Sequence, residues 1–471
     1  MNEAPRLQPL EPGTRALVLG LGRTGLSCAR YLRRRGLEVR VADTRDCPPG
    51  LDALREDFAE VELRTGAFAP ALLDDVDQVV ISPGLSVREP VVLEAGRRGL
   101  PVVGDIELFV REAQAPVAAV TGTNGKSTVT TLVSELATAA GRPALAGGNL
   151  GEPALDLLAR PLPALYVLEL SSFQLETTYS LRTVTSTVLN VTPDHMDRYA
   201  TVAEYAQAKA RIFDGCEVAV VNADDALVRE MPRAGQRVLS FGIVARDADY
   251  VLVRDPEPLV LRRGEPLLPL SRLHIQGGHN VANAMAALAM CEALELPDAP
   301  VLAALADFGG LPHRAQWVAD IDGVRYVNDS KGTNVGATVA AVAGMSGPLV
   351  MIAGGDGKNA DFSGLREAFR GKVRHAVLIG RDAPRIAAAL GNRPGKFGSE
   401  PINQEYSAPS RISICSTEIA ADMASAVRAA RAAARPGDTV LLSPACASLD
   451  MFRDYTHRGE EFMAAVRSLA P

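Results

Sequence analysis

The sequence predicts an α/β protein of three domains, and three observations carry this prediction. Short apolar runs typical of buried strands lead into glycine-bearing loops and then helix-prone stretches, as in residues 15–35 and 116–140. The same order recurs after the apolar run 349–353. A chain of 471 residues is also too long for one hydrophobic core. We expect an N-terminal Rossmann-like domain, a central phosphate-loop domain with a mostly parallel sheet, and a C-terminal Rossmann-like domain.

Composition narrows the class of protein. The chain is 47% hydrophobic and 22% charged, which indicates globular domains rather than disorder. Its net charge of −7 argues against a nucleic-acid partner, which would need many phosphate contacts. Six cysteines without Cys-x-x-Cys spacing indicate reduced thiols and no zinc site. No apolar run reaches about 18 residues, and the N-terminus lacks the apolar core of a signal peptide, so we expect a cytoplasmic protein without a membrane partner.

The first glycine motif is Gly-Leu-Gly-Arg-Thr-Gly at residues 20–25, directly after the apolar run 15–19. A second apolar run, 37–42, ends at Asp43, about 20 residues past the glycines, as the dinucleotide-binding pattern requires. One interpretation is an NAD-dependent dehydrogenase. The same geometry holds any nucleotide linked through a pyrophosphate, including a UDP-sugar, so the motif alone leaves both open.

The second glycine motif, Thr-Gly-Thr-Asn-Gly-Lys-Ser-Thr at 121–128, lies between an apolar run and a helix-prone run at 129–140. Such a turn directs backbone N–H groups and a helix N-terminus at a phosphate. Lys126 can reach terminal phosphates, and Ser127 or Thr128 can ligate Mg²⁺. Gly122 precedes Gly125 by three residues, where the common pattern has five. We expect a nucleoside triphosphate site here.

Three further residues of the central segment could take part in chemistry. Glu169 ends the apolar run 165–169, where a carboxylate beside a phosphate loop could hold Mg²⁺ or could form a buried salt bridge. His195 follows the run 185–191, and Lys209 lies in the helix-prone stretch 205–213. Taken alone, a core or capping histidine and a solvated lysine are the commoner roles.

Seven motifs in this order resemble the Mur ligases, the ATP-dependent amide-forming enzymes of peptidoglycan precursor synthesis. The resemblance covers essentially the whole chain, and its last two motifs are most similar to members that add D-glutamate. The motifs are Thr-Gly-Thr-Asn-Gly-Lys-Ser-Thr at 121–128, Glu-Leu-Ser-Ser-Phe-Gln-Leu-Glu at 169–176, Asp-His-Met-Asp-Arg-Tyr at 194–199, Leu-Pro-His-Arg at 311–314, Asn-Asp-Ser-Lys at 328–331, Gly-Gly-Asp-Gly-Lys at 354–358 and Ser-Pro-Ala-Cys-Ala-Ser-Leu-Asp at 443–450.

The resemblance implies a two-step reaction and three domain roles. The L-alanine carboxylate of UDP-N-acetylmuramoyl-L-alanine attacks the γ-phosphate of ATP, and the amine of D-glutamate then attacks the acyl phosphate, giving an amide, ADP and phosphate. Residues 1–104 would bind the UDP-muramyl substrate, residues 105–309 would bind ATP, and residues 310–471 would bind the amino acid and close over ATP about the Gly309-Gly310 hinge.

The resemblance also assigns residues to each ligand. Those implied to contact ATP are Gly122, Thr123, Asn124, Gly125, Lys126, Ser127, Thr128, Asn280, Asn283, Arg314 and Asp329. Those implied to contact the UDP substrate are Arg23, Thr24, Asp43, Thr44, Arg45, Ser82, Gly84, Asn149 and His195. Those implied to form the D-glutamate pocket are Lys331, Thr333, Lys358, Ser448, Leu449 and Tyr455.

Catalytic roles are implied for Lys126, Glu169, His195 and Lys209, with two Mg²⁺ ions. Ser127 and Glu169 would ligate one ion, and His195 and Lys209 the other. An ordinary ammonium has no acceptor for a cation, so Lys209 would have to be carbamylated, which converts its charge from positive to negative. The family also implies a monomer.

Three features depart from the family pattern. Tyr455 stands where we expect Phe beside the amino-acid pocket. Gly332 stands where we expect Ala, and it should loosen a substrate loop. Residues 391–412 form a polar insertion without an assigned role.

Several rival functions stay open. A sister ligase adding L-alanine or a diamino acid, or a folylpolyglutamate synthase, would share the motifs but take another amino acid. An NAD-dependent dehydrogenase would leave the loop at 121–128 unexplained, and a non-catalytic nucleotide switch would leave the C-terminal segment unexplained.

Overall fold

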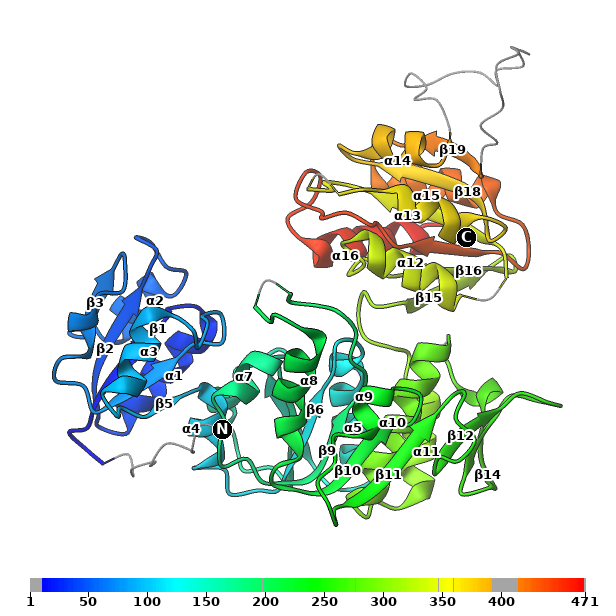
Figure 1. Cartoon of the computed structure of the whole chain (residues 1–471). Helices are drawn as coiled ribbons and strands as arrows, with labels where there is room; N and C mark the ends of the chain where they lie inside the picture. The colour runs from blue at the N-terminus through cyan, green and yellow to red at the C-terminus, as the bar shows by residue number, and fades with distance from the viewer. Residues whose placement is uncertain are drawn as a thin grey trace. The chain divides into compact units, whose positions relative to one another are not determined.

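The computed structural model of the chain describes residues 11–196, 198–275, 277–345, 347–358, 360–391 and 414–469. Within these residues, three sheets of five, nine and six strands, each with helices packed on it, confirm the predicted α/β class (Figure 1). The chain divides into two compact units, Met1–Arg272 with Ala282–Ala306 and Leu273–Val281 with Asp307–Pro471. Within the described ranges, no helix is long and apolar enough to cross a membrane.

The first sheet is parallel and has the order β3-β2-β1-β4-β5. The order reverses beside β1, so the glycine loop that follows β1 lies where a doubly wound sheet binds nucleotides. The strands are β1 Arg15–Leu19, β2 Glu38–Asp43, β3 Glu62–Thr65, β4 Gln78–Ile81 and β5 Val102–Val103. The helices are α1 Arg23–Arg34, α2 Leu51–Asp57, the 3₁₀ helix Pro70–Leu73, α3 Pro90–Arg97 and α4 Asp105–Val110.

Alternation along β1 explains how this sheet is covered on both faces. Leu17 and Leu19 belong to one core cluster with residues of α3, whereas Ala16 and Val18 belong to another with residues of α1. The second cluster continues into the nine-stranded sheet through residues such as Ala119. A shared core therefore joins the first two sheets into one unit.

The second sheet has the order β14-β13-β12-β11-β10-β9-β6-β8-β7 and is parallel from β7 to β12, with antiparallel β13 and β14 at one edge. Its strands are β6 Val117–Thr121, β7 Ala144–Gly148, β8 Leu165–Glu169, β9 Thr183–Val188, β10 Cys216–Asn222, β11 Arg237–Gly242, β12 Tyr250–Val253, β13 Leu259–Arg262 and β14 Glu265–Pro269. Its helices include α5 Lys126–Ala139, α6 Ala154–Leu157, α7 Ser172–Glu176, α8 Val202–Ala210 and α9 Ala226–Arg229, followed in the chain by α10 Gly278–Ala293 and α11 Asp298–Asp307.

The third sheet has the order β15-β16-β20-β17-β18-β19, and only β15 is antiparallel to its neighbour. Its strands are β15 Gln316–Ile321, β16 Val324–Asn328, β17 Leu349–Gly354, β18 Val373–Ile379, β19 Ser416–Ile419 and β20 Thr439–Leu442. Its helices are α12 Val335–Gly344, α13 Ser363–Phe369, α14 Ala383–Ala389, α15 Met423–Ala433 and α16 Tyr455–Arg467. Leu442 pairs with Asn328 on one side and Ile352 on the other, so the loops after β16, β20 and β17 leave one edge together.

Some predicted elements need correction. The helix α5 begins at Lys126, three residues before the predicted helix. The prediction missed β3, β15 and β19, which are short or part-exposed edge strands without a continuous apolar run. Apart from Gly391, the insertion at 391–412 lies outside the described residues, as does Asp197 of the motif at 194–199.

Candidate active site

The loop at 121–128 runs from the end of β6 into the first turn of α5. Gly125 precedes the helix with φ +85°, and a Cβ added there would lie 2.4 Å from the Asn283 side-chain oxygen. Glycine is therefore required by both conformation and space. Because α5 begins at Lys126, the loop runs directly into the N-terminus of a helix, the end that favours an anion.

Two lysines converge on one carbonyl of this loop. Lys126 Nζ donates to the Gly122 carbonyl at 2.9 Å and to the Thr123 carbonyl at 3.0 Å, and Lys209 Nζ donates to the same Gly122 carbonyl at 2.9 Å. Lys209 is 1% exposed. Burial, together with repulsion from Lys126, lowers the pKa of Lys209 to about 7, against the attraction of Asp194 and Glu169. A substantial fraction of Lys209 is therefore the neutral amine near pH 7.

Glu169 ends β8 with a carboxylate that is only half satisfied. The side chain is 3% exposed, and its Oε1 accepts a hydrogen bond of 2.6 Å from Asn149. Its Oε2 is buried and has no hydrogen-bond partner among the described residues. A buried carboxylate oxygen without a donor fits a hard cation, which prefers oxygen ligands. The register that pairs Glu169 with Gly148 and Val120 sets this oxygen at the edge from which the phosphate loop leaves.

His195 and Lys209 both lie close to the Tyr205 ring. Lys209 Nζ is 4.4 Å from the centroid of the Tyr205 ring, and the His195 ring centroid is 6.1 Å from it. His195 also packs edge-on against Phe173 at 4.9 Å and is exposed. Within the described ranges, no group of three or more His, Cys, Asp or Glu side chains is arranged to hold a metal. The predicted ligand set therefore needs oxygens from Ser127, from a modified lysine or from substrate.

The aromatic neighbours Tyr205 and Phe173 were missed by sequence reasoning. Tyr205 lies four residues before Lys209 in α8, a spacing that puts the two side chains on one helix face. That spacing is the signal that could have found Tyr205. The other predicted ATP contacts of α10, Asn280 and Asn283, are both buried.

The first glycine loop is held by Asp43, which ends β2 and is 2% exposed. Its Oδ2 accepts the Leu21 N–H at 2.7 Å and the Arg45 guanidinium at 2.6 Å, and its Oδ1 accepts the Arg45 N–H and Nε at 2.9 and 2.8 Å. The Arg45 guanidinium is the main cause that lowers the pKa of Asp43 to about 2. Both oxygens are thus engaged within the protein.

The remaining predicted contacts of the UDP substrate surround this loop. Ser82 lies directly against Gly20, because a Cβ added to that glycine would be 3.0 Å from the Ser82 Cβ. Arg23 and Thr24 open α1, whose N-cap has no side-chain hydrogen bond, so their N–H groups are available to an anion. Thr44, which directly follows Asp43, and Gly84, which lies two residues after Ser82, are both exposed.

In the second unit, the predicted residues follow β16, β17 and β20. Asp329 is part-buried; its Oδ2 accepts the Ser443 hydroxyl at 2.7 Å and its Oδ1 the Ala315 N–H at 3.2 Å. Burial raises the pKa of Asp329 to about 6. Arg314 is exposed, and its neighbour His313 is buried against Asn328.

The predicted amino-acid pocket consists of two groups of residues. Lys331 Nζ lies 3.9 Å from the centroid of the Tyr455 ring, a cation–π contact that accounts for an aromatic side chain at position 455. The second group depends on a β-bridge between Asp356 and Ala447, which sets the loops of Lys358 and Ser448 side by side. Ser448 is buried, whereas Lys358 and Leu449 are exposed; Thr333 is part-buried and its N–H donates to the Lys331 carbonyl.

Gly332 does not loosen this loop, contrary to expectation. It is buried, and a Cβ at this position would lie 2.7 Å from the Ser443 hydroxyl and 2.8 Å from the Asp329 carboxylate. The absence of a side chain lets the loop pack closely against β20, so the expected loosening was wrong for steric reasons.

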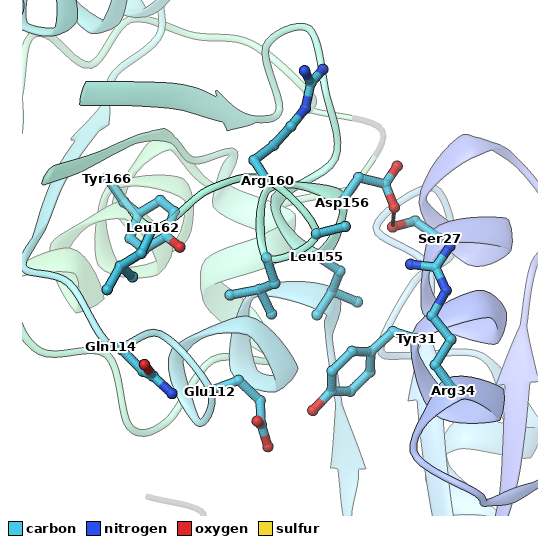
Figure 2. A pocket seen from close by; sticks show the side chains of 12 residues that line it. Ser27, Tyr31, Arg34, Glu112, Gln114, Leu155, Asp156, Arg160, Leu162 and Tyr166 are labelled. Atoms are coloured by element: carbon cyan, nitrogen blue, oxygen red, sulfur yellow. Dashed lines mark hydrogen bonds between the residues drawn. The ribbon is translucent and has the colours of Figure 1, made fainter. Parts of the chain in front are cut away.

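A cavity of about 420 Å³ between α1, α6 and residues 112–114 contains no predicted site residue (Figure 2). Ser27 donates to the Asp156 carboxylate at 2.6 Å across it. Glu112 pairs with Arg35, and Arg160 pairs with Glu152. Because Glu112 and Arg160 are paired within the protein, we interpret this cavity as a gap between packed helices and not as the catalytic site.

The fold and the site define a nucleotide-dependent enzyme in which a phosphate loop, a half-satisfied carboxylate and a buried lysine share one sheet edge. Three family models match the chain: the Mur ligase MurD-like N-terminal domain at 14–104, the Mur ligase middle domain at 120–291, and the Mur ligase glutamate ligase domain at 313–446. The chain belongs to the Mur ligase family.

Two similar relatives are UDP-N-acetylmuramoylalanine--D-glutamate ligases. The protein of Nitrosococcus oceani is 49% identical over 468 residues, covering 98% of this chain and 99% of its own, and that of Methylobacillus flagellatus is 52% identical over 458 residues, covering 96% of each. Among solved structures, UDP-N-acetylmuramate-alanine ligase MurC of Thermotoga maritima is 17% identical with a TM-score of 0.57, covering 97% of this chain and 99% of its own. That likeness establishes the shared fold.

Proposed function

We propose that this protein is the ligase that adds D-glutamate to UDP-N-acetylmuramoyl-L-alanine, with ATP as the energy source, in peptidoglycan precursor synthesis. The observation that carries this proposal is identity of about half over nearly the full length to relatives named for that reaction. Ligases that add another amino acid share the fold, as the alanine ligase of Thermotoga maritima shows. The relatives that are about half identical to this chain, however, are named as D-glutamate ligases. The phosphate loop supports the ATP requirement, which the dehydrogenase alternative leaves unexplained.

The first step joins two anions, so charge neutralisation and orientation are its main demands. In the proposal, the loop N–H groups and Lys126 hold the terminal phosphates of ATP, and the Gly122 carbonyl that Lys126 now contacts fixes its starting position. Bound Mg²⁺ would add positive charge next to the phosphate oxygens. Glu169 and Ser127 are the residues proposed to hold that ion, and the orphaned Glu169 Oε2 supports the assignment.

We propose that Lys209 is carbamylated. Its neutral amine would attack CO₂, forming an N–C bond and releasing one proton, and the product is a carbamate with one negative charge. The lowered pKa of Lys209 supports this chemistry, because an ammonium is not a nucleophile. A carbamate there would change the pair Lys126–Lys209 from mutual repulsion to attraction and would provide, with His195, ligands for a second ion.

In the second step, the amine of D-glutamate attacks the acyl phosphate carbonyl, the new amide bond forms, and phosphate leaves. We propose that Lys331 and Lys358 face the carboxylates of the amino acid and that Ser448 donates a hydrogen bond. The first sheet is proposed to bind the UDP group through the N–H groups of Arg23 and Thr24, with Ser82 and Arg45 beside them. We further propose that the protein is cytoplasmic and a monomer; light scattering on the purified protein tests the oligomeric state.

The deciding experiment measures ADP release with every combination of ATP, UDP-N-acetylmuramoyl-L-alanine and an amino acid. D-Glutamate should support turnover and yield an amide product, whereas L-glutamate, L-alanine and diaminopimelate should not. Preference for another amino acid would assign the chain to a sister ligase. ADP release that needs no amino acid would contradict the proposal.

A further inference from the structure

Arg458 is a fully buried cation whose role neither the reaction nor the sequence motifs explain. It lies in the first turns of α16 and is 0% exposed. Its Nε donates to the Ser330 hydroxyl at 3.0 Å, Nη2 to the Ser330 carbonyl at 2.8 Å, and Nη1 to the Cys446 carbonyl at 3.0 Å. Across the described ranges, no carboxylate forms a salt bridge with it. Asp450 and Asp329 favour its charge electrostatically without forming a salt bridge, so the well-placed acceptors must provide the remaining compensation for burying the charge.

The acceptors belong to two different loops at one sheet edge. Ser330 lies in the loop after β16, next to Lys331, and Cys446 lies in the loop after β20, two residues before Ser448. The Ser330 hydroxyl in turn donates to the Tyr455 carbonyl at 2.7 Å. One guanidinium thus joins the loop of Lys331, the loop of Ser448 and the start of α16, where Tyr455 stacks on Lys331.

Only a planar fork of donors can make this junction. The guanidinium presents N–H groups in fixed directions, and here each of its three nitrogens contacts a different acceptor atom. A lysine ammonium has the charge but a single donor centre, so it could contact one loop and not both in the same geometry.

We propose that Arg458 is a positioning residue for the amino-acid acceptor: it fixes the distance between the Lys331–Tyr455 pair and Ser448, the two sides of the pocket. This inference rests on the proposed function, because it takes the pocket to be that of D-glutamate. The residue contacts no predicted substrate group itself.

The same loop carries Asp329, a predicted ATP contact, yet Asp329 is held by other groups. Its carboxylate accepts from Ser443 and from the Ala315 N–H, and its own N–H donates to the Leu442 carbonyl. None of these bonds passes through Arg458. Arg458 acts on the Asp329 carboxylate only by electrostatic attraction, which Arg458→Lys retains, so loss of the guanidinium fork should disturb the acceptor side of the pocket more than the ATP side.

The test compares Arg458→Lys and Arg458→Met with Arg374→Met as a matched control. Arg374 pairs with the buried Asp438 next to β20 at its opposite end, so its loss destabilises the same unit without touching the two loops. For each variant, thermal unfolding, the KM for each substrate and acyl-phosphate formation without D-glutamate are measured.

We expect Arg458→Lys to fold and to raise the KM for D-glutamate by about tenfold to a hundredfold, the range for a lost charged hydrogen bond, with the KM for ATP and acyl-phosphate formation within about threefold of wild type. Arg374→Met should lower the unfolding temperature without this KM change. If Arg458→Met does not fold, Ser330→Ala provides a milder break of the same junction and should shift the KM for D-glutamate in the same direction.

Three results would overturn the inference. They are an unchanged KM for D-glutamate in Arg458→Lys, an equal loss for all substrates, or the same kinetic change in Arg374→Met. If wild-type enzyme turns over with another amino acid, the proposed function fails, but a selective rise in the KM for that amino acid would still support the positioning role. Absence of any wild-type turnover would overturn both.

Discussion

Asp43 and Glu169 occupy equivalent places in two sheets, yet they differ in how their oxygens are used. Each is a buried carboxylate at the end of a strand next to a glycine loop. Asp43 accepts hydrogen bonds on both oxygens, from Leu21 and Arg45. Glu169 accepts one hydrogen bond from Asn149, and its second oxygen is buried without a partner.

The difference shows that an acidic residue at the end of a strand, beside a glycine loop, can have either of two roles. The charge of Asp43 is compensated by Arg45, and its hydrogen bond with the Leu21 N–H holds the first glycine loop against the end of β2. Glu169 keeps an uncompensated acceptor in a buried place, which is stable only if something positive can approach it. In the proposed mechanism, the first would be a preformed scaffold for a ligand, and the second would provide one ligand of a cation site.

The largest expected effect follows from removing the charge at the incomplete site. Glu169→Gln should lower the rate of ADP release about a thousandfold, because the amide keeps the shape and can still accept from Asn149 but replaces an anionic ligand by a neutral and much weaker one. Thermal unfolding should stay within a few degrees of wild type. Rates near wild type would show that the orphaned oxygen has no catalytic role.

Lys209→Ala should be nearly as damaging, because it removes the proposed carbamate. Acetate or formate, added at high concentration, should partly restore ADP release by occupying the vacated space with a carboxylate. Lys209→Arg is the control: it keeps a cation that cannot react with CO₂, so small carboxylates should not rescue it. Full activity of Lys209→Ala would disprove the role of this residue.

Asp43→Asn tests the other carboxylate and should have a smaller, different effect. It removes the ion pair with Arg45 and loosens the first glycine loop, so the KM for the UDP substrate should rise about tenfold, the equivalent of roughly 1.4 kcal/mol. The rate at saturation should change little. A loss as large as that of Glu169→Gln would erase the distinction between the two acids.

The prediction with the smallest effect on turnover concerns stability and its dependence on pH. Burial raises the pKa of Asp105, at the start of α4, to about 6 from an ordinary value of 3.8, and Gln174 contacts one of its oxygens. The folded state therefore binds more protons than the unfolded state between these pKa values, so the free energy of unfolding falls as pH rises from about 4 to 6, by on the order of 3 kcal/mol.

Denaturant unfolding across this pH range checks the expectation. Asp105→Asn should remove the slope contributed by this group, since an amide does not titrate. An identical pH dependence in wild type and variant would assign the slope to other groups.

Much of the architecture could be predicted from local sequence patterns. The apolar runs before residues 20 and 121, with their glycines, predicted β1, β6 and the helices after them, because strand, turn and helix signals coincide there. The edge strand β15 escaped prediction, because it is stabilised by pairing with β16 rather than by its own pattern.

The roles of individual side chains were harder to predict, because they depend on long-range partners. Arg45 is only two residues from Asp43, but the Leu21 N–H that donates to the same carboxylate comes from 22 residues away, in the first glycine loop. Arg458 gave no signal at all, since its acceptors lie 128 and 12 residues away along the chain. Gly332 was misjudged for the same reason: its constraint comes from Ser443, which directly follows β20.

The measurement that tests the central distinction most directly is Mn²⁺ binding, followed by electron paramagnetic resonance in the presence of a non-hydrolysable ATP analogue. Wild type and Asp43→Asn should bind Mn²⁺ with similar affinity, whereas Glu169→Gln should bind it at least about tenfold more weakly, since it lacks the carboxylate ligand. Equal Mn²⁺ affinity in wild type and Glu169→Gln, or a loss in Asp43→Asn, would contradict the account.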